Sequence, residues 1–196
     1  ACAGLDCQPQ TAANAAMGVT FTGGADITIQ SITGNTSTLN FNKTGNGTLT
    51  VNGNVTSSAT ASNIRPQGGV LSFSSTATTT SNSTIISQRS VGGILKIASG
   101  ASIKTNADAN TDGIMGGWAV FNNTDWAQVN GVGTAISAYT GYTNDTWSSG
   151  ANTDVTTSSA PASGSTTGSL RFNTASANTI TLAGHNRSEE HTSELQ

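Results

Sequence analysis

Six aspartates are the side chains of this sequence that could act together as general acids and bases. Clustered carboxylates of this kind cleave glycan chains in many hydrolases. Nothing in their spacing brings them together, and the basic residues are scattered along the chain. We therefore predict no catalytic residue and no cofactor site in this segment. The six are Asp26, Asp108, Asp112, Asp125, Asp145 and Asp154.

Nucleophilic catalysis assisted by histidine is not indicated either. Before the last ten residues the sequence contains a single histidine, His185, in Gly184-His185-Asn186. No Gly-x-Ser-x-Gly elbow, the strand-to-helix turn that exposes a catalytic serine, occurs in the sequence. The sequence therefore predicts that this segment is not an enzyme.

Residues 108–113 have the D-x-N-x-D-G spacing that opens a calcium loop. Alternate oxygen ligands would come from Asp108, Asn110 and Asp112, and the glycine would permit the sharp turn. The twelfth position is Ala119, where a bidentate glutamate is expected. Because Asn, Asp and Gly also fill ordinary turns, we predict a turn and no metal, with calcium as the alternative.

Aromatic residues gather in one stretch of the chain. Residues 117–147 contain six of the ten aromatic residues. Exposed flat rings could stack on sugars or form a contact patch. Trp and Tyr are on average highly buried, so we predict that they fill the core instead. The six are Trp118, Phe121, Trp126, Tyr139, Tyr142 and Trp147.

The elements that position these side chains follow an internal repeat. Four quartets with apolar second and fourth residues begin 22, 22 and 24 residues apart, and each follows glycine. Alternation with a period of two is typical of half-buried strands. The quartets are residues 26–29, 48–51, 70–73 and 94–97.

A repeat of this length is typical of one coil of a β-solenoid. One coil cannot bury its own apolar face, so stability comes from stacking several coils. We predict an all-β fold, a right-handed parallel β-helix that is incomplete here. The alternative is an antiparallel β-sandwich, which does not explain glycine at a near-fixed offset.

Further strands are expected outside the four quartets. Weaker strands are predicted at 38–41 and 84–86, and later ones at 135–140, 169–172 and 179–182. Residues 116–127 predict two strands joined by a turn at Asn122-Asn123. We divide the chain into a ragged edge (1–17), solenoid coils (18–105), a Trp/Tyr-rich insertion or strand pair (106–150), a loop with resumed coils (151–186) and a non-native tail (187–196).

Composition limits the partners of the chain. Thr, Ser, Asn and Gly make up 100 of the 196 residues, and only 9% of residues are charged. Without a basic surface the segment is not expected to bind nucleic acid. No apolar run approaches the roughly 20 residues of a membrane-spanning helix, so we expect no membrane insertion by this segment.

The last ten residues differ from the rest of the chain. Residues 187–196 carry all three glutamates, and their sequence is similar to the translation of a widely used short-read sequencing adapter. We predict that this tail is non-native and that the chain is part of a longer reading frame. Cys2 and Cys7 could form a short disulfide or pair with cysteines outside the segment.

The aromatic stretch and the strands after it carry a family resemblance. The succession Gly117-Trp118-Ala119, Asp125-Trp126-Ala127, then residues 169–173 and 179–182 resembles bacterial proteins with autotransporter-associated β-strand repeats. The resemblance covers roughly residues 90–185. It implies a secreted or outer-membrane, cell-surface passenger with a β-helical stalk.

The function expected from these patterns is structural. We predict a secreted or surface-displayed stalk with a role in adhesion, whose partners are glycans or other surface proteins. The alternative is a β-helix that binds or degrades polysaccharides.

Overall fold

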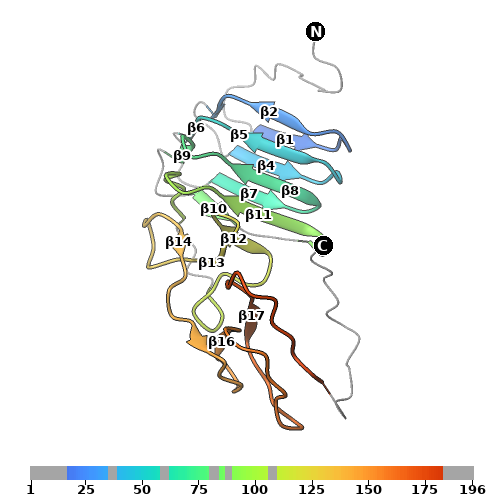
Figure 1. Ribbon diagram of the computed structural model, residues 1–196. Coiled ribbons are helices and arrows are strands. Elements are labelled where there is room, and N and C mark those ends of the chain that lie inside the picture. Colours follow the sequence, from blue (N-terminus) through green and yellow to red (C-terminus); the bar gives the residue numbers. More distant parts are fainter. Residues whose placement is uncertain are drawn as a thin grey trace. The chain divides into compact units, whose positions relative to one another are not determined.

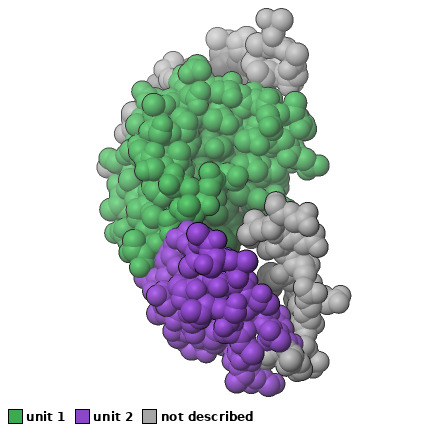
Figure 2. Space-filling model, in the orientation of Figure 1, with its two compact units in different colours: residues 1–140 green, residues 141–196 purple. Residues whose placement is uncertain are grey.

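The structure, a computed structural model, describes residues 17–34, 39–57, 62–79, 84–86, 90–105 and 110–182. The secondary-structure elements assigned within these ranges are all β-strands. The chain divides into two compact units, residues 1–140 and 141–196 (Figure 2). The tail, His185, Asp108 and both cysteines lie outside the described residues.

Unit 1 is built from coils of up to three short strands. Equivalent strands of successive coils lie side by side and run parallel (Figure 1). The first coil is β1 (Met17–Phe21), β2 (Ile27–Ile29) and β3 (Ile32–Gly34); the second is β4 (Leu39–Lys43), β5 (Thr48–Val51) and β6 (Asn54–Ser57); the third is β7 (Ser62–Pro66), β8 (Gly69–Phe73) and β9 (Thr78–Thr79); the fourth contains β10 (Thr84–Ile86) and β11 (Gly93–Ile97).

Three parallel ladders result from this stacking. They have the strand orders β1-β4-β7-β10, β2-β5-β8-β11 and β3-β6-β9, and Ser102 bridges to Thr78 at the end of the third. The predicted parallel β-solenoid is therefore confirmed. The antiparallel β-sandwich is wrong, because all strand pairs between these coils are parallel.

The register of the coils follows the spacing of the quartets. Ile27 pairs with Leu49, Leu49 with Leu71, and Leu71 with Leu95. These offsets are the 22, 22 and 24 residues predicted from the sequence. Since side chains alternate across a strand, this register places like side chains above one another.

The core of unit 1 consists of columns of apolar side chains that point into the coils. One column in the first ladder contains Val19, Phe41, Ile64 and Ile86. The rings of Phe21 and Phe41 also pack together, with centroids 5.3 Å apart. Dense apolar packing is the main stabilising term here, at about 25 cal/mol per Å² buried. The largest fully buried apolar side chains are Leu39, Phe41, Leu49, Val51, Ile64, Leu71, Phe73, Leu95, Ile97, Ile103 and Ile136.

Glycines at the corners permit close approach between coils. A Cβ built on Gly93 would lie 2.0 Å from the carbonyl oxygen of Pro66 in the coil before it. Gly69 combines such a contact, 2.3 Å from the oxygen of Gly45, with a φ of +58°. Gly69 is therefore favoured both by its positive φ and by space, whereas Gly93 is required by space alone.

Beyond the fourth coil the pairing of the strands changes from parallel to antiparallel. β12 (Ala119–Phe121) adds to β11 in parallel, again 24 residues on, but β13 (Asp125–Gln128) and β14 (Ser137–Ala138) are antiparallel. The predicted turn at Asn122-Asn123 is confirmed, since both residues have positive φ and the Thr124 N–H donates to the Phe121 carbonyl at 3.2 Å. The strand expected at 135–140 is only two residues long.

Unit 2 contains a small parallel sheet. Its strands are β15 (Thr143–Asn144), β16 (Asn152–Asp154) and β17 (Ser169–Arg171), with β16 in the centre. The strand predicted at 169–172 is confirmed as far as Arg171. The strand predicted at 179–182 is reduced to one bridge between Ser159 and Ile180. No helix capable of crossing a bilayer occurs in the part of the chain that the structure describes.

Candidate functional site

The described aspartates of unit 1 that were candidates for acid–base chemistry lie on different elements of the fold. In unit 1, the Asp26 carboxylate accepts the Thr48 backbone N–H at 2.7 Å, and that of Asp125 accepts the Thr124 hydroxyl at 2.8 Å. Asp112 is exposed in a turn. No three His, Cys, Asp or Glu side chains form a metal-binding group among the described residues.

The calcium-like sequence is a turn where the structure describes it. Asp112 and Gly113 have φ of 51° and 86°, and Thr111 pairs with Ile114 across them. Both polar atoms of the Asn110 amide bind the backbone of Val129, at 2.7 and 3.1 Å. The predicted turn is confirmed. Since Asp108 lies outside the described residues, the calcium alternative stays untested.

Of the two acids described in unit 2, Asp145 forms the denser cluster of hydrogen bonds. Its carboxylate accepts the backbone N–H and the hydroxyl of Thr156, and both corresponding groups of Thr157. These bonds stabilise the ionised form, and the hydroxyl of Thr156 contributes most to holding the pKa of Asp145 below its ordinary value. The carboxylate therefore fastens a loop and stays ionised at neutral pH.

Asp154 and Arg171 form an ion pair between β16 and β17. Arg171 Nη2 donates to Asp154 Oδ2, and the two side chains are only 16% and 10% exposed. The guanidinium carbon also lies 3.5 Å from the centre of the Tyr142 ring, a cation–π contact. Asp145 and Asp154 are neighbours through a backbone hydrogen bond of 3.0 Å. Their carboxylates, however, bind different partners.

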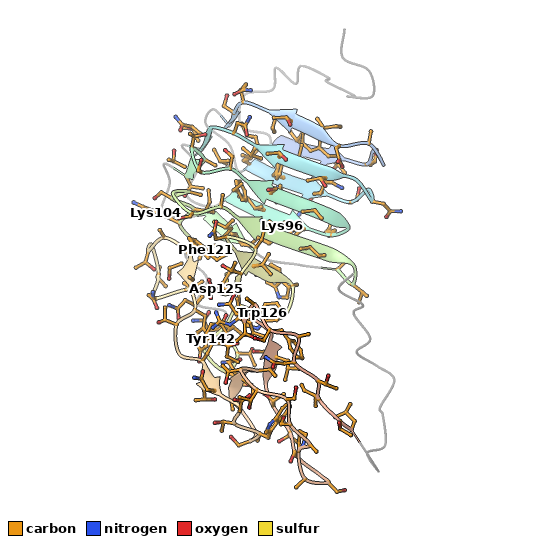
Figure 3. The ribbon with its side chains drawn as sticks, viewed as in Figure 1. Lys96, Lys104, Phe121, Asp125, Trp126 and Tyr142 are labelled. Carbon is orange, nitrogen blue, oxygen red and sulfur yellow. The ribbon has the colours of Figure 1, made fainter. Side chains whose placement is uncertain are left out.

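The six aromatic residues of the 117–147 stretch are all half-buried rather than fully enclosed. Trp118 and Phe121 pack against the apolar core, which confirms the core prediction for these two. The Tyr139 ring lies against the backbone of Gly113, where an added Cβ would meet it at 2.8 Å. Trp126 lies on β13 beside Val120 of β12 and is not part of the core cluster (Figure 3).

The outer face of the seven-stranded sheet has two halves. On β2 and β5 the outward side chains are hydroxyls: Thr28, Thr48 and Thr50. From β8 to β13 they become mostly apolar. We call five of them the outer patch: Val70, Ile94, Lys96, Val120 and Trp126.

Lys43 is a buried cation that the sequence analysis did not single out. It is 2% exposed, and its Nζ donates to the carbonyl oxygens of Gly45 and Gly68 at a corner. Burial lowers the pKa of Lys43, and the Asp26 carboxylate opposes this shift. The alternation of Leu39, Phe41 and Lys43 along β4 was the available signal that this side chain points inward.

Lys96 and Arg171 were also missed. Each is the third residue of a predicted four-residue strand, 94–97 or 169–172, a position that alternation places opposite the apolar second and fourth residues. The positive charge of Lys96 and Arg171 at these positions was therefore the signal available in the sequence that the two side chains could have specific partners.

Comparison with known proteins gives no relative to which these residues could be matched. No family model matches the chain, and no curated protein or solved structure matches it significantly.

Proposed function

We propose that this chain is a structural segment, a β-solenoid stalk of a secreted or surface-displayed bacterial protein of the autotransporter-associated β-strand repeat type. The observation that carries the proposal is the continuous register of the coils. Coils at offsets of 22 to 24 residues stack the same inward columns on one another. Each coil extends the stack by about 4.8 Å.

The mechanism of such a stalk is geometric. Backbone hydrogen bonds between coils run along the direction of stacking, and each apolar column continues through several coils. A coil is stabilised by the coils on both sides, as in other repeat proteins. Length is therefore gained without any new kind of contact.

An extracellular location is supported by composition and by the resemblance. The described coils use Thr, Ser and Asn on outward and turn positions, which stay soluble with few charges. The Gly-Trp-Ala and Asp-Trp-Ala elements, which resemble the passenger-type repeat proteins, form β12, the hairpin and β13. Adhesion would then be a property of the outward side chains.

Pulling on single molecules tests the stalk. If coils are the mechanical units, unit 1 should unfold in steps that each release 22 to 24 residues, or about 75–85 Å of extended chain. A single step that releases the whole of unit 1 would contradict independent coils.

The proposed export can be tested by sequencing the gene around this segment. A secretion signal encoded upstream in the same reading frame supports the proposal. A reading frame that joins the segment to enzymes of the cytoplasm would contradict it.

Polysaccharide binding is the second candidate function, and the outer patch favours binding over degradation. Purified protein incubated with pectin-like and algal polysaccharides should leave their chain lengths unchanged. Cleavage detected as new reducing ends would contradict the structural proposal.

A further inference from the structure

We propose that Asn130 is a site of spontaneous covalent modification, at which the folded chain loses ammonia and gains a negative charge. The side-chain amide becomes a carboxylate through a cyclic imide that Asn130 forms with the next residue, Gly131. The proposal concerns one loop of unit 1. It does not rest on the stalk function or on the polysaccharide binding proposed above.

The reaction requires only these two residues and water. The backbone nitrogen of Gly131 attacks Cγ of Asn130, and the bond between Cγ and Nδ2 breaks. The proton of the attacking N–H leaves with Nδ2 as ammonia. Water then opens the five-membered imide at either of its carbonyl groups, which gives aspartate or its isomer isoaspartate at position 130. No group is oxidised or reduced.

Three asparagines of the chain are followed by glycine and are therefore candidates for this reaction: Asn46, Asn52 and Asn130. Because glycine has no side chain, the attacking nitrogen is unhindered and the backbone rotates easily. The sequence alone does not rank the three. The structure does, because ring closure requires the backbone between asparagine and glycine to rotate.

The first of these pairs is enclosed between coils of the solenoid. A Cβ built on Gly47 would lie 2.5 Å from the carbonyl oxygen of Ala25, in the coil before it. On the other side, the Gly47 carbonyl accepts the N–H of Val70 at 3.3 Å. The peptide between residues 46 and 47 therefore has backbone on both sides and little room to rotate.

The second pair is held by hydrogen bonds to both neighbouring coils. Asn52 donates its N–H to the Ile29 carbonyl at 2.9 Å, and its own carbonyl accepts the Ser74 hydroxyl at 3.3 Å. A Cβ built on Gly53 would lie 2.2 Å from the oxygen of Gln30. Rotation at either pair would break contacts between coils, so we expect both to react only when the stack opens locally.

The pair Asn130 and Gly131 has the freedom that the other two lack. Asn130 is exposed, and both residues lie in the loop between β13 and β14. Within 4 Å, a Cβ built on Gly131 would meet one described atom, the methyl carbon of Thr134 at 4.0 Å. In the part of the chain that the structure describes, the N–H of Gly131 donates no hydrogen bond. The attacking nitrogen is therefore available.

The hydrogen bond of the Asn130 side chain is compatible with the reaction. Its Nδ2 donates to Ser137 Oγ at 3.1 Å, so the contact is with the nitrogen that leaves and not with the carbon that is attacked. A hydroxyl group can donate as well as accept. Ser137 can thus return a proton to Nδ2 as the bond to Cγ breaks.

The modification changes unit 1 at a position that is otherwise held firmly. Asn110 binds the backbone of Val129, the residue before Asn130, through both polar atoms of its amide. Isoaspartate adds one carbon to the main chain directly after Val129, and both products add a negative charge. The loop between β13 and β14 therefore carries a chemical record of the age of the molecule.

The test ages the whole folded chain in mildly alkaline buffer made with heavy-oxygen water, followed by peptide mapping with mass spectrometry. Each opened imide contains one heavy oxygen atom, and chromatography separates isoaspartate from aspartate. We expect Asn130 to react at least about tenfold faster than Asn46 and Asn52, because those two must await local opening of the stack. Both isomers should form at position 130.

The matched control is the same chain unfolded in urea, where all three pairs are free to rotate. There we expect the three asparagines to react at similar rates. Asn130→Gln is a second control, since its longer side chain would have to close a six-membered ring. This variant should lose the early modification at position 130 and keep the slow ones.

Three results in the folded chain would overturn the proposal: an unmodified Asn130, equal rates at the three asparagines, or aspartate without isoaspartate. None of them would alter the unfolding of unit 1 in coil-sized steps. Failure of the modification site is therefore distinguishable from failure of the stalk.

Discussion

The two units bury different kinds of side chain. In unit 1 the residues at the centre of each coil are Leu, Val, Ile and Phe in continuous columns. In unit 2 the central strand β16 buries Asn152, Thr153 and Asp154. Apolar contact is non-directional, so one coil resembles the next and the pattern can repeat. Polar groups need particular partners, and that arrangement cannot be copied to the next strand.

The polar strand of unit 2 has a specific partner for each buried side chain. Asn152 accepts from the hydroxyl of Ser169 at 2.6 Å, and Thr153 shares a hydrogen bond of 2.8 Å with Thr167. Asp154 pairs with Arg171. Networks of specific polar partners define one structure, whereas removing one member leaves a buried group without its partner. The comparison predicts different responses to substitution in the two units.

The largest effect is expected in the apolar columns. Phe73 is fully buried between Val51 and Ile97 in the register. Phe73→Ala should lower the free energy of unfolding by about 4 kcal/mol, because the lost contacts and the cavity add. Urea denaturation measures this change. Ser72→Ala, one residue away on the outer face, is the control and should change little; a similar loss in both would contradict the column model.

At the corners between coils, we expect added side-chain volume, rather than its removal, to lower the stability of the fold. In Gly93→Ala the new methyl group meets the carbonyl oxygen of Pro66, so two coils must separate. We expect a loss of about 3 kcal/mol of unfolding free energy. Gly18→Ala is the matched control, since its Cβ meets nothing within 4 Å. Equal stability of the two variants, measured by thermal unfolding, would refute close packing at this corner.

In unit 2, breaking the ion pair should be costly although little apolar area is lost. Arg171→Met leaves the Asp154 carboxylate without its cation, and we expect about 2 kcal/mol of destabilisation after allowing for the residual exposure. Hydrogen exchange of the β16 amides reports this locally. The double variant Arg171→Met/Asp154→Leu should recover part of the loss, and no recovery would argue against an uncompensated charge as the cause.

The smallest effect is a pH dependence confined to unit 2. Because hydrogen bonds hold the pKa of Asp145 below its unfolded value, its contribution to stability is present above the unfolded value, near 3.8. This contribution is lost as pH falls through the lower, folded pKa. Exchange of the Thr156 and Thr157 amides should therefore accelerate in acid, while the amides of β5 and β8 change less. Asp145→Asn should remove the pH dependence, and a persistent one would point to another group.

The coils of unit 1 could be predicted because each has to satisfy the same columns. Leu49, Leu71 and Leu95 recur in equivalent positions since each stacks on the previous one. The strands β3, β6 and β9 escaped prediction, because they are short and consist largely of Thr, Ser and Asn with little alternation. These strands are defined by the coils above and below them, not by their own sequence.

The polar arrangement of unit 2 was not predictable from local patterns. Asp145 binds residues eleven and twelve positions away, and Asp154 binds a partner seventeen positions away. No periodicity relates such positions, and each bond depends on the fold being in place. The sequence indicated the strand at Ser169–Arg171 but not the neighbour whose charge Arg171 balances.

The reversal between β12 and β13 has a consequence for how the stack can grow. A parallel edge offers the next coil the same donors and acceptors as the last one, so nothing in the coils themselves limits their number. An antiparallel strand changes that template, and β14 ends the sheet with only two residues. The hairpin thus acts as a terminator: it sets the length of this sheet and protects its end from fibre-like addition of further chains.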